Sequence, residues 1–136
     1  MPQNPDCIFC KIVAGQIPAA KILETDSAIA FLDIAPGHTL LVAKEHHATL
    51  ADTPPDLAAK LAAELPRLVR AVLVATGASG LNVVQNNGRD AGQVVAHVHF
   101  HFIPRSPGDG LRLHWPQGKY EGGAMDEMRS RIAAAV

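Results

Sequence analysis

Residues 97–105 read HVHFHFIPR, so histidine and apolar residues alternate through the first six positions. Successive side chains of a β-strand point to opposite faces of the sheet. As a strand, this stretch places His97, His99 and His101 on one face and apolar side chains on the other. Imidazole titrates near neutral pH and serves as a ligand, acid, base or nucleophile. The pattern therefore predicts a strand with a core on one side and a chemical site on the other.

The segments before this strand predict the rest of a sheet. Apolar runs over residues 19–26, 28–34 and 38–44 are separated by short turns rich in aspartate, serine, proline and glycine, which are typical of hairpins. Residues 81–85, LNVVQ, predict a further strand. Connections of hairpin length favour antiparallel pairing. We therefore expect an α+β fold with a five-stranded antiparallel sheet.

One long helix is expected between these strands. Apolar residues recur every three or four positions over residues 57–72, which predicts a helix with a single apolar stripe. Thr53 is the expected N-cap, and Gly77 or Gly80 the expected end. Two shorter helices are expected near the termini, over residues 7–16 and 125–134.

Composition limits the function classes. The chain has 136 residues, of which 48% are hydrophobic, and this size predicts a single domain over residues 1–136. The formal net charge of -1 provides no overall field for nucleic acid or an anionic membrane. The apolar runs are shorter than the roughly 20 residues that cross a bilayer, and the N-terminus has no signal-peptide pattern. We expect a cytoplasmic protein that binds neither nucleic acid nor membrane.

Cys7 and Cys10 are the two cysteines of the chain. Two cysteines do not make the disulfide framework of a small secreted protein, which again favours the reducing cytoplasm. Their C-x-x-C spacing allows both thiolates to bind one zinc ion, or to form a redox pair of the thioredoxin type. The redox interpretation requires a βαβ context that the sequence does not predict.

Three interpretations of the histidine strand remain open from the pattern alone. The histidines are ordinary hydrogen-bonded or surface residues, or two of them share a catalytic zinc ion with a bound water, or one imidazole attacks phosphorus while its neighbours hold the phosphate oxygens. The loop at residues 86–93, NNGRDAGQ, contains glycines that allow backbone N–H groups to approach a phosphate closely. This loop favours a phosphorylated ligand.

The segment HVHFHFI resembles the defining pattern of the histidine triad (HIT) family. The similarity extends to CIFCKIVAGQIPA at residues 7–19, AFLDIAPGHTLLVAKEH at 30–46, NGRDAGQVVAHVHFHFIPR at 87–105 and LHWPQG at 113–118. It covers nearly the whole chain and is strongest for the branch of nucleotide hydrolases and purine nucleoside phosphoramidases.

The resemblance implies a HIT-like α+β domain that forms a two-fold homodimer and binds a purine nucleotide such as AMP. It implies cleavage at the α-phosphate of a nucleoside phosphoramidate, nucleotidyl ester or dinucleoside polyphosphate. The reaction would pass through a nucleotidyl-histidine intermediate and need no catalytic metal. Two other functions stay open, namely a non-catalytic module that binds nucleotides or a protein partner, and a metal-dependent hydrolase.

The resemblance also assigns roles to single residues. His99 corresponds to the family nucleophile, with its second nitrogen held by a backbone carbonyl. Of the other catalytic positions, His101 contacts the phosphate, His97 begins the triad, and His38 supports the triad from the neighbouring strand. The substrate-binding positions correspond to Asp33 and Ile34 at ribose and base, to Asn86, Gly92 and Gln93 at phosphate and leaving group, and to Trp115 near the partner's site.

A structural zinc site is implied as well, with Cys7, Cys10, His46 and His97 as ligands, although the adjacent His47 competes for the third position. The four ligands would close a tetrahedral shell and leave no position for catalysis.

The sequence departs from the family pattern at two places. Asp33 and His38 are separated by fewer residues than is usual, so two interpretations of Asp33 stay open, a ribose contact and a residue that forms a turn at the end of a strand. Val94 stands where some phosphoramidases have a serine.

Overall fold

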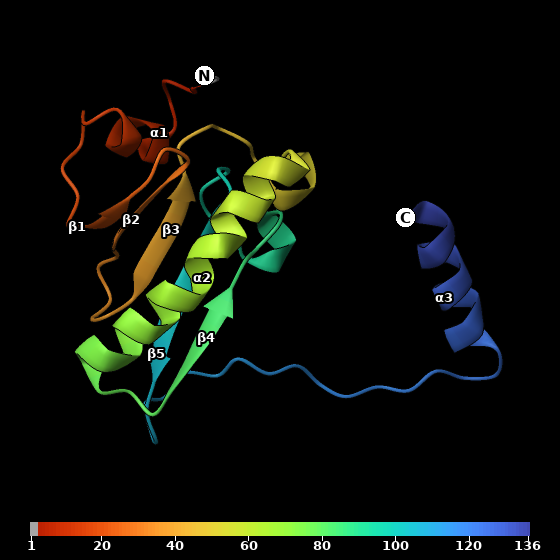
Figure 1. The fold of residues 1–136 in the computed structure, drawn as a ribbon. Helices are drawn as coiled ribbons and strands as arrows, with labels where there is room; N and C mark the ends of the chain where they lie inside the picture. The colour runs from red at the N-terminus through yellow and green to blue at the C-terminus, as the bar shows by residue number, and fades with distance from the viewer. Residues whose placement is uncertain (1–2) are drawn as a thin grey trace.

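The computed structural model describes residues 3–136, and an antiparallel five-stranded sheet forms its body (Figure 1). The strands follow the order β1-β2-β3-β5-β4, and every neighbouring pair is antiparallel. They comprise β1 (Lys21–Glu24), β2 (Ala28–Leu32), β3 (Thr39–Ala43), β4 (Gly80–Val84) and β5 (His99–Arg105). With the long helix, this confirms the predicted α+β fold.

The side chains of β5 alternate between the two faces, as predicted. Phe102 is fully buried and packs, together with Val98, in the core cluster beneath the long helix α2 (Pro55–Thr76). That helix buries one apolar stripe, made of Leu57, Leu61, Leu68 and Val72, against this face. On the opposite face, the ring of Phe9 contacts His97 and His99 edge-on. The histidines therefore lie on the side of the sheet away from α2.

The short helix α1 (Ile8–Val13) covers part of this second face. Phe9 and Cys10 of α1 pack in a second core cluster with residues of β2 and β3. Ile29 of β2 and Val42 of β3 point into this cluster, while their neighbours Ala28 and Leu41 point into the first one. The alternation gives the sheet two apolar faces and brings α1 beside the histidines.

Most elements end within a few residues of their expected bounds, and the starts of α2 and β5 differ in an informative way. Thr53 is not the N-cap of α2, because Pro54 has that position. The Thr53 hydroxyl instead donates to the Thr49 carbonyl at 2.8 Å, at the end of the 3-10 helix η1 (Leu50–Asp52). The assigned strand β5 begins at His99 instead of His97. The end of α2 at Gly77, which has a left-handed φ of 67°, agrees with one of the two predicted positions.

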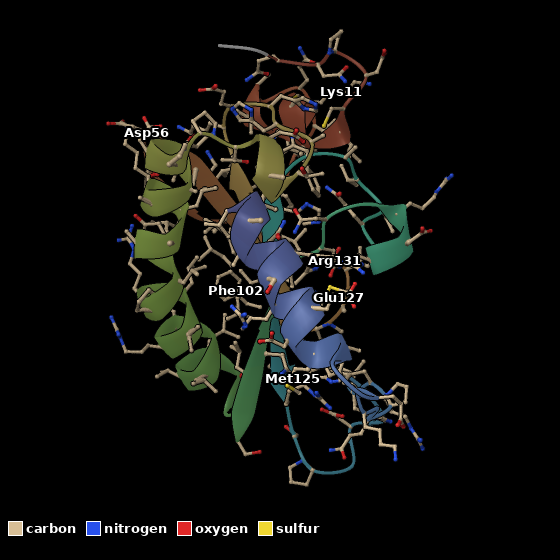
Figure 2. All side chains as sticks on the ribbon, turned by 90° about the vertical axis from the view of Figure 1, so that its right-hand side faces the viewer. Lys11, Asp56, Phe102, Met125, Glu127 and Arg131 are labelled. Carbon is tan, nitrogen blue, oxygen red and sulfur yellow. The ribbon has the colours of Figure 1, made fainter. Side chains whose placement is uncertain are left out.

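The chain beyond β5 leaves the body as an arm (Figure 1). Residues 106–136 are all exposed, and they end in the helix α3 (Ala124–Ala135). Figure 2 looks from the side on which α3 lies and shows Met125, Glu127 and Arg131 along this helix. Asp56 of α2 lies at the left of that view. Within residues 3–136, no helix combines the length and the apolarity that crossing a membrane requires.

Gly37, in the turn between β2 and β3, is tightly enclosed. Its φ is +74°, and a Cβ added there would lie 2.8 Å from Thr76 Cγ2 and 3.1 Å from Pro104 Cγ. We expect Gly37→Ala to lower the free energy of unfolding by about 2–4 kcal/mol, because it adds overpacking to backbone strain. Urea denaturation of the variant measures the loss.

Gly15 provides a matched control for that substitution. Its φ is +75°, but a Cβ there would meet nothing within 4 Å. Gly15→Ala should therefore cost only the backbone part, about 1–2 kcal/mol. Equal losses in the two variants would contradict the enclosure of Gly37.

Candidate active site

A pocket of about 390 Å³ opens on the face of the sheet opposite α2. Its polar side chains come from His99 and His101 of β5 and from Asp33 after β2. Gly92, in the loop before β5, also lines the pocket. The rest of the wall is apolar, and it consists of Ile8, Phe9, Ile12, Phe31, Leu40, Val94 and Val95. Such a wall suits a planar organic group next to a small polar centre.

His99 is held with one nitrogen fixed. Its Nδ1 lies 2.5 Å from the backbone carbonyl of His97, so Nδ1 carries the proton and donates it. Nε2 then holds the lone pair, and within residues 3–136 no hydrogen-bond partner for it is present. Burial lowers the pKa of His99, although the bond to the His97 carbonyl opposes this shift. His99 is therefore an uncharged imidazole with Nε2 as its basic nitrogen, and this residue lines the pocket.

The imidazole rings of His101 and His38 are in contact with each other. His38 Nε2 lies 3.1 Å from His101 Nδ1, which is a hydrogen-bond distance. On its other side, His38 Nδ1 lies 3.7 Å from a carboxylate oxygen of Asp33. Burial, together with the neighbouring His99 and His38, lowers the pKa of His101 to about 4. His101 is therefore an uncharged ring near neutral pH.

His97 faces a different cluster from the other two triad histidines. Its Nε2 lies 2.7 Å from the Ala43 carbonyl and donates to it, which leaves Nδ1 as the basic nitrogen. Nδ1 lies 3.4 Å from Cys7 Sγ, 3.6 Å from Cys10 Sγ and 3.2 Å from His46 Nδ1. Burial lowers the pKa of His97 to about 4 and raises that of the Cys10 thiol. These four side chains therefore converge with their ligand atoms inward.

The cluster fits a zinc ion. Zn–S bonds of about 2.3 Å and Zn–N bonds of about 2.0–2.1 Å in a tetrahedron separate the ligand atoms by roughly 3.3–3.8 Å. Four of the six distances between these ligand atoms are 3.2–3.6 Å, including 3.3 Å between Cys10 Sγ and His46 Nδ1. All four ligand atoms lie within 4.8 Å of one another. His47 lies outside the cluster, and its Nε2 pairs with the Glu45 carboxylate at 2.9 Å.

The glycine-containing loop before β5 is folded around the side chain of Gln93. Gln93 Oε1 accepts from the Gly88 N–H at 2.7 Å, and Nε2 donates to the carbonyls of Ala48 at 2.6 Å and Val95 at 3.1 Å. Gly92 has a left-handed φ of 90°, and its Cα faces the Asn86 amide. In this structure the amide of Gln93 shapes the loop, and Gly92 is the loop residue that reaches the pocket wall.

Four predicted substrate positions do not line the pocket within one chain, namely Ile34, Asn86, Gln93 and Trp115. Ile34 is 99% exposed, and Trp115 is 80% exposed beside β4, near Val83. Sequence reasoning missed the contribution of α1, whose Phe9 ring lies 5.0 Å from the His99 ring. The apolar residues between the two cysteines were the available signal for this wall.

Comparison with known proteins identifies the family. A family model described as the HIT domain matches residues 14–108, which is more than half of the chain. The chain belongs to the HIT family.

Relatives of this HIT protein include named enzymes. The adenosine 5′-monophosphoramidase hnt1 of Schizosaccharomyces pombe is 48% identical over 114 residues, which cover 81% of this chain and 83% of that protein. The adenylylsulfatase HINT3 of Arabidopsis thaliana is 42% identical over 109 residues, which cover 78% of this chain. The match spans 55% of the length of the Arabidopsis protein.

Solved structures share the fold of this HIT protein. A crystal structure from Streptococcus mutans UA159 has a TM-score of 0.93 and 38% identity, and the match covers 98% of this chain and 87% of that one. A zinc-bound histidine triad family protein from Mycobacterium smegmatis has a TM-score of 0.73 and 37% identity, with coverage of 96% and 98%.

Proposed function

We propose that this HIT protein is a nucleotide hydrolase or transferase that cleaves adenylates at the α-phosphate through a nucleotidyl-histidine intermediate on His99. The observation that carries the proposal is the 2.5 Å bond from His99 Nδ1 to the His97 carbonyl, because it leaves Nε2 as an uncharged nucleophile. Adenosine phosphoramidates are the preferred substrate class, and nucleotidyl esters and dinucleoside polyphosphates belong to the same reaction type.

The reaction divides into two displacements at phosphorus. In the first, His99 Nε2 forms a bond to the α-phosphorus, the bond from phosphorus to the leaving amine breaks, and the amine takes one proton from the His38–His101 pair. In the second, the oxygen of water bonds to phosphorus, the bond to Nε2 breaks, and the proton of that water returns to the pair. Positioning and charge stabilisation supply most of the catalysis in phosphoryl transfer.

The remaining substrate contacts are assigned by position. The apolar wall around Phe9 would hold the base, with Asp33 and Ile34 near ribose and base. His101 and the loop residues Asn86, Gly92 and Gln93 would surround the phosphate and the leaving group. The left-handed Gly92 supports this assignment, because a backbone without Cβ allows close approach of an anion.

The Cys7, Cys10, His46 and His97 cluster would hold a structural zinc ion. Zinc in a site of this type supplies folding energy and not reactivity, because four protein ligands leave no position for water. His99 and His101 do not belong to the cluster. This separation favours nucleophilic catalysis over a metal-dependent hydrolase.

We also propose that the protein works as a two-fold homodimer whose arms contact the partner. An isolated helix of the length of α3 is marginal in water, yet Met125, Met128 and Ile132 form an exposed apolar stripe on it. A second copy of the chain would cover this stripe. Trp115, at the base of the arm, would then approach the partner's pocket.

Charge placed on the stripe tests the dimer. Ile132→Glu should weaken dimer formation by at least about 10-fold, because a carboxylate replaces an apolar side chain that the partner would cover. Sedimentation velocity measures the dissociation constant. Ser130→Glu adds the same charge on the opposite side of α3 and should leave the constant unchanged, so equal effects of the two variants would contradict the contact.

Mass spectrometry of the quenched enzyme tests the proposed chemistry. Protein is denatured at alkaline pH during turnover of an adenosine 5′-phosphoramidate, because a bond from phosphorus to imidazole nitrogen is lost in acid. After digestion, the peptide containing His99 should carry one adenylate. Rapid cleavage without any adduct, or an adduct on another residue, would overturn the mechanism.

A further inference from the structure

An apolar groove of about 270 Å³ lies between the C-terminal half of α2 and the strands β1 and β2. Its apolar walls are formed by Leu68, Ala71, Val72 and Ala75 of α2, Ile22 of β1 and Leu32 of β2. Ile22 and Leu32 are 46% and 45% exposed, so large apolar side chains face water there. We call this feature the α2 groove. It shares no lining residue with the pocket at His99.

The two threonines of the α2 groove already use their hydroxyl groups within the chain. Thr76 donates to the Val72 carbonyl at 2.7 Å, and Thr39 donates to the Gly37 carbonyl at 3.3 Å. An extended peptide in the groove would therefore leave backbone N–H and C=O groups without partners, which is costly. An α-helix satisfies these groups itself. The groove consequently fits a helix that carries an apolar stripe.

The helix α3 has the matching properties. Met125, Met128 and Ile132 are 63%, 38% and 59% exposed, and no residue of α3 is buried. At 1.5 Å per residue, this stripe is about 10 Å long, and the wall from Leu68 to Ala75 is about 10 Å long as well. The arginines of α3 pair with acidic residues of the same helix, so its charges need no partner in the groove.

The α2 groove and α3 lie at opposite edges of the sheet of one chain. Ile22 belongs to β1, the first strand in the order β1-β2-β3-β5-β4, whereas arm residues 112–115 border a hollow beside β4, the last strand. Figure 1 shows α3 beyond β4, on the side away from β1. A second copy can bring its groove to this helix. Because each copy has one arm and one groove, the same contact forms twice and closes a two-fold dimer.

We propose that α3 of each chain docks in the α2 groove of a second copy, with its apolar stripe against Ala71 and Ala75. This inference rests on the proposed homodimer and names the surface of the partner that each arm contacts. The exchange removes apolar surface from water on both sides of the contact. It leaves the pocket at His99 open, because the groove lies elsewhere.

A charge in the α2 groove tests the docking site. Ala71 is exposed in the single chain, so Ala71→Glu should fold with the circular dichroism spectrum of the wild type. Its dimer dissociation constant, measured by sedimentation velocity, should rise by about 10-fold or more, because the stripe would cover an unpaired carboxylate. An unchanged constant would overturn the proposal.

Ala59→Glu is the matched control. It makes the same substitution at an exposed position earlier in α2, outside the groove. The dissociation constant of this variant should equal that of the wild type. Equal weakening by Ala59→Glu and Ala71→Glu would show a general effect of charge on α2 and would also overturn the docking site.

A mixture of two damaged chains tests the exchange itself. In a heterodimer of Ala71→Glu with Ile132→Glu, one arm–groove contact carries both substitutions and the other carries neither. The heterodimer should therefore form about 3-fold or more tightly than either homodimer, since half of the lost free energy returns. The one-to-one mixture should show more dimer in sedimentation velocity than either variant alone at the same total concentration. No gain on mixing would overturn the exchange, as would an arm that fills the groove of its own chain.

The same measurements separate this inference from the proposed homodimer. A wild type that stays monomeric would contradict both. A wild-type dimer that Ile132→Glu weakens and Ala71→Glu leaves intact would contradict the groove alone, and the arm would then dock on another surface of the partner. Cleavage of adenylates is measured independently of either result.

Discussion

His99→Ala should reduce cleavage of an adenosine 5′-phosphoramidate by about 10⁴-fold or more, which is the loss typical of a removed nucleophile. The ring is 5% exposed, its Nδ1 is fixed by the His97 carbonyl, and it lines the pocket. Its removal therefore eliminates the attacking atom but leaves most of the apolar wall. AMP should still bind to the variant within a few-fold of the wild-type affinity, as calorimetry can measure.

His114→Ala is the control for this loss, because His114 is an exposed histidine in the arm and lies outside the pocket. Its steady-state kcat should stay close to that of the wild type. If His99→Ala retained cleavage within 10-fold of the wild type, the covalent mechanism would be wrong. If the wild type cleaved no adenylate but bound AMP tightly, a nucleotide-binding module would be the better description.

Removal of zinc should have the largest effect on stability. The ligand atoms join the start of α1, the chain after β3 and the chain before β5, which are far apart in the sequence. A closed zinc site contributes several kcal/mol to folding, so the melting temperature should fall by about 10 °C or more. The comparison is between zinc-loaded protein, chelator-treated protein and the double variant Cys7→Ser, Cys10→Ser.

Metal content identifies the histidine ligand. Elemental analysis should give one zinc per chain for the wild type and for His47→Ala, because the His47 ring pairs with Glu45 outside the cluster. His46→Ala should lose most of the metal. Retained zinc in His46→Ala with loss in His47→Ala would reverse the assignment, and an unchanged melting temperature after chelation would contradict a structural role.

Local pattern was sufficient for much of the fold. The alternation at residues 97–102 predicted the two faces of β5, and the leucine spacing predicted the buried stripe of α2. Both signals depend only on the period of a single element. The four candidate zinc ligands also came from the sequence, through a family resemblance, and the structure gathers these side chains in one cluster.

Long-range packing determined what the sequence did not predict. The start of α2 differed because Thr53 caps the end of the preceding 3-10 helix, and local cap rules do not include that element. The Gln93 side-chain amide hydrogen-bonds to three backbone groups, and one of them is at Ala48, far away in the sequence. The distance between Asp33 and His38 depends on how tightly one turn closes, which spacing alone does not give.

Folding of the sheet and docking of the arm are two separate equilibria. Residues 106–136 are exposed throughout and α3 has no buried residue, so the sheet owes little of its stability to them. Docking of the arm on another molecule is second order in chain concentration. If the proposed homodimer forms, dilution should detach the arms from the partner while the sheet stays folded, so activity and folding would depend differently on chain concentration.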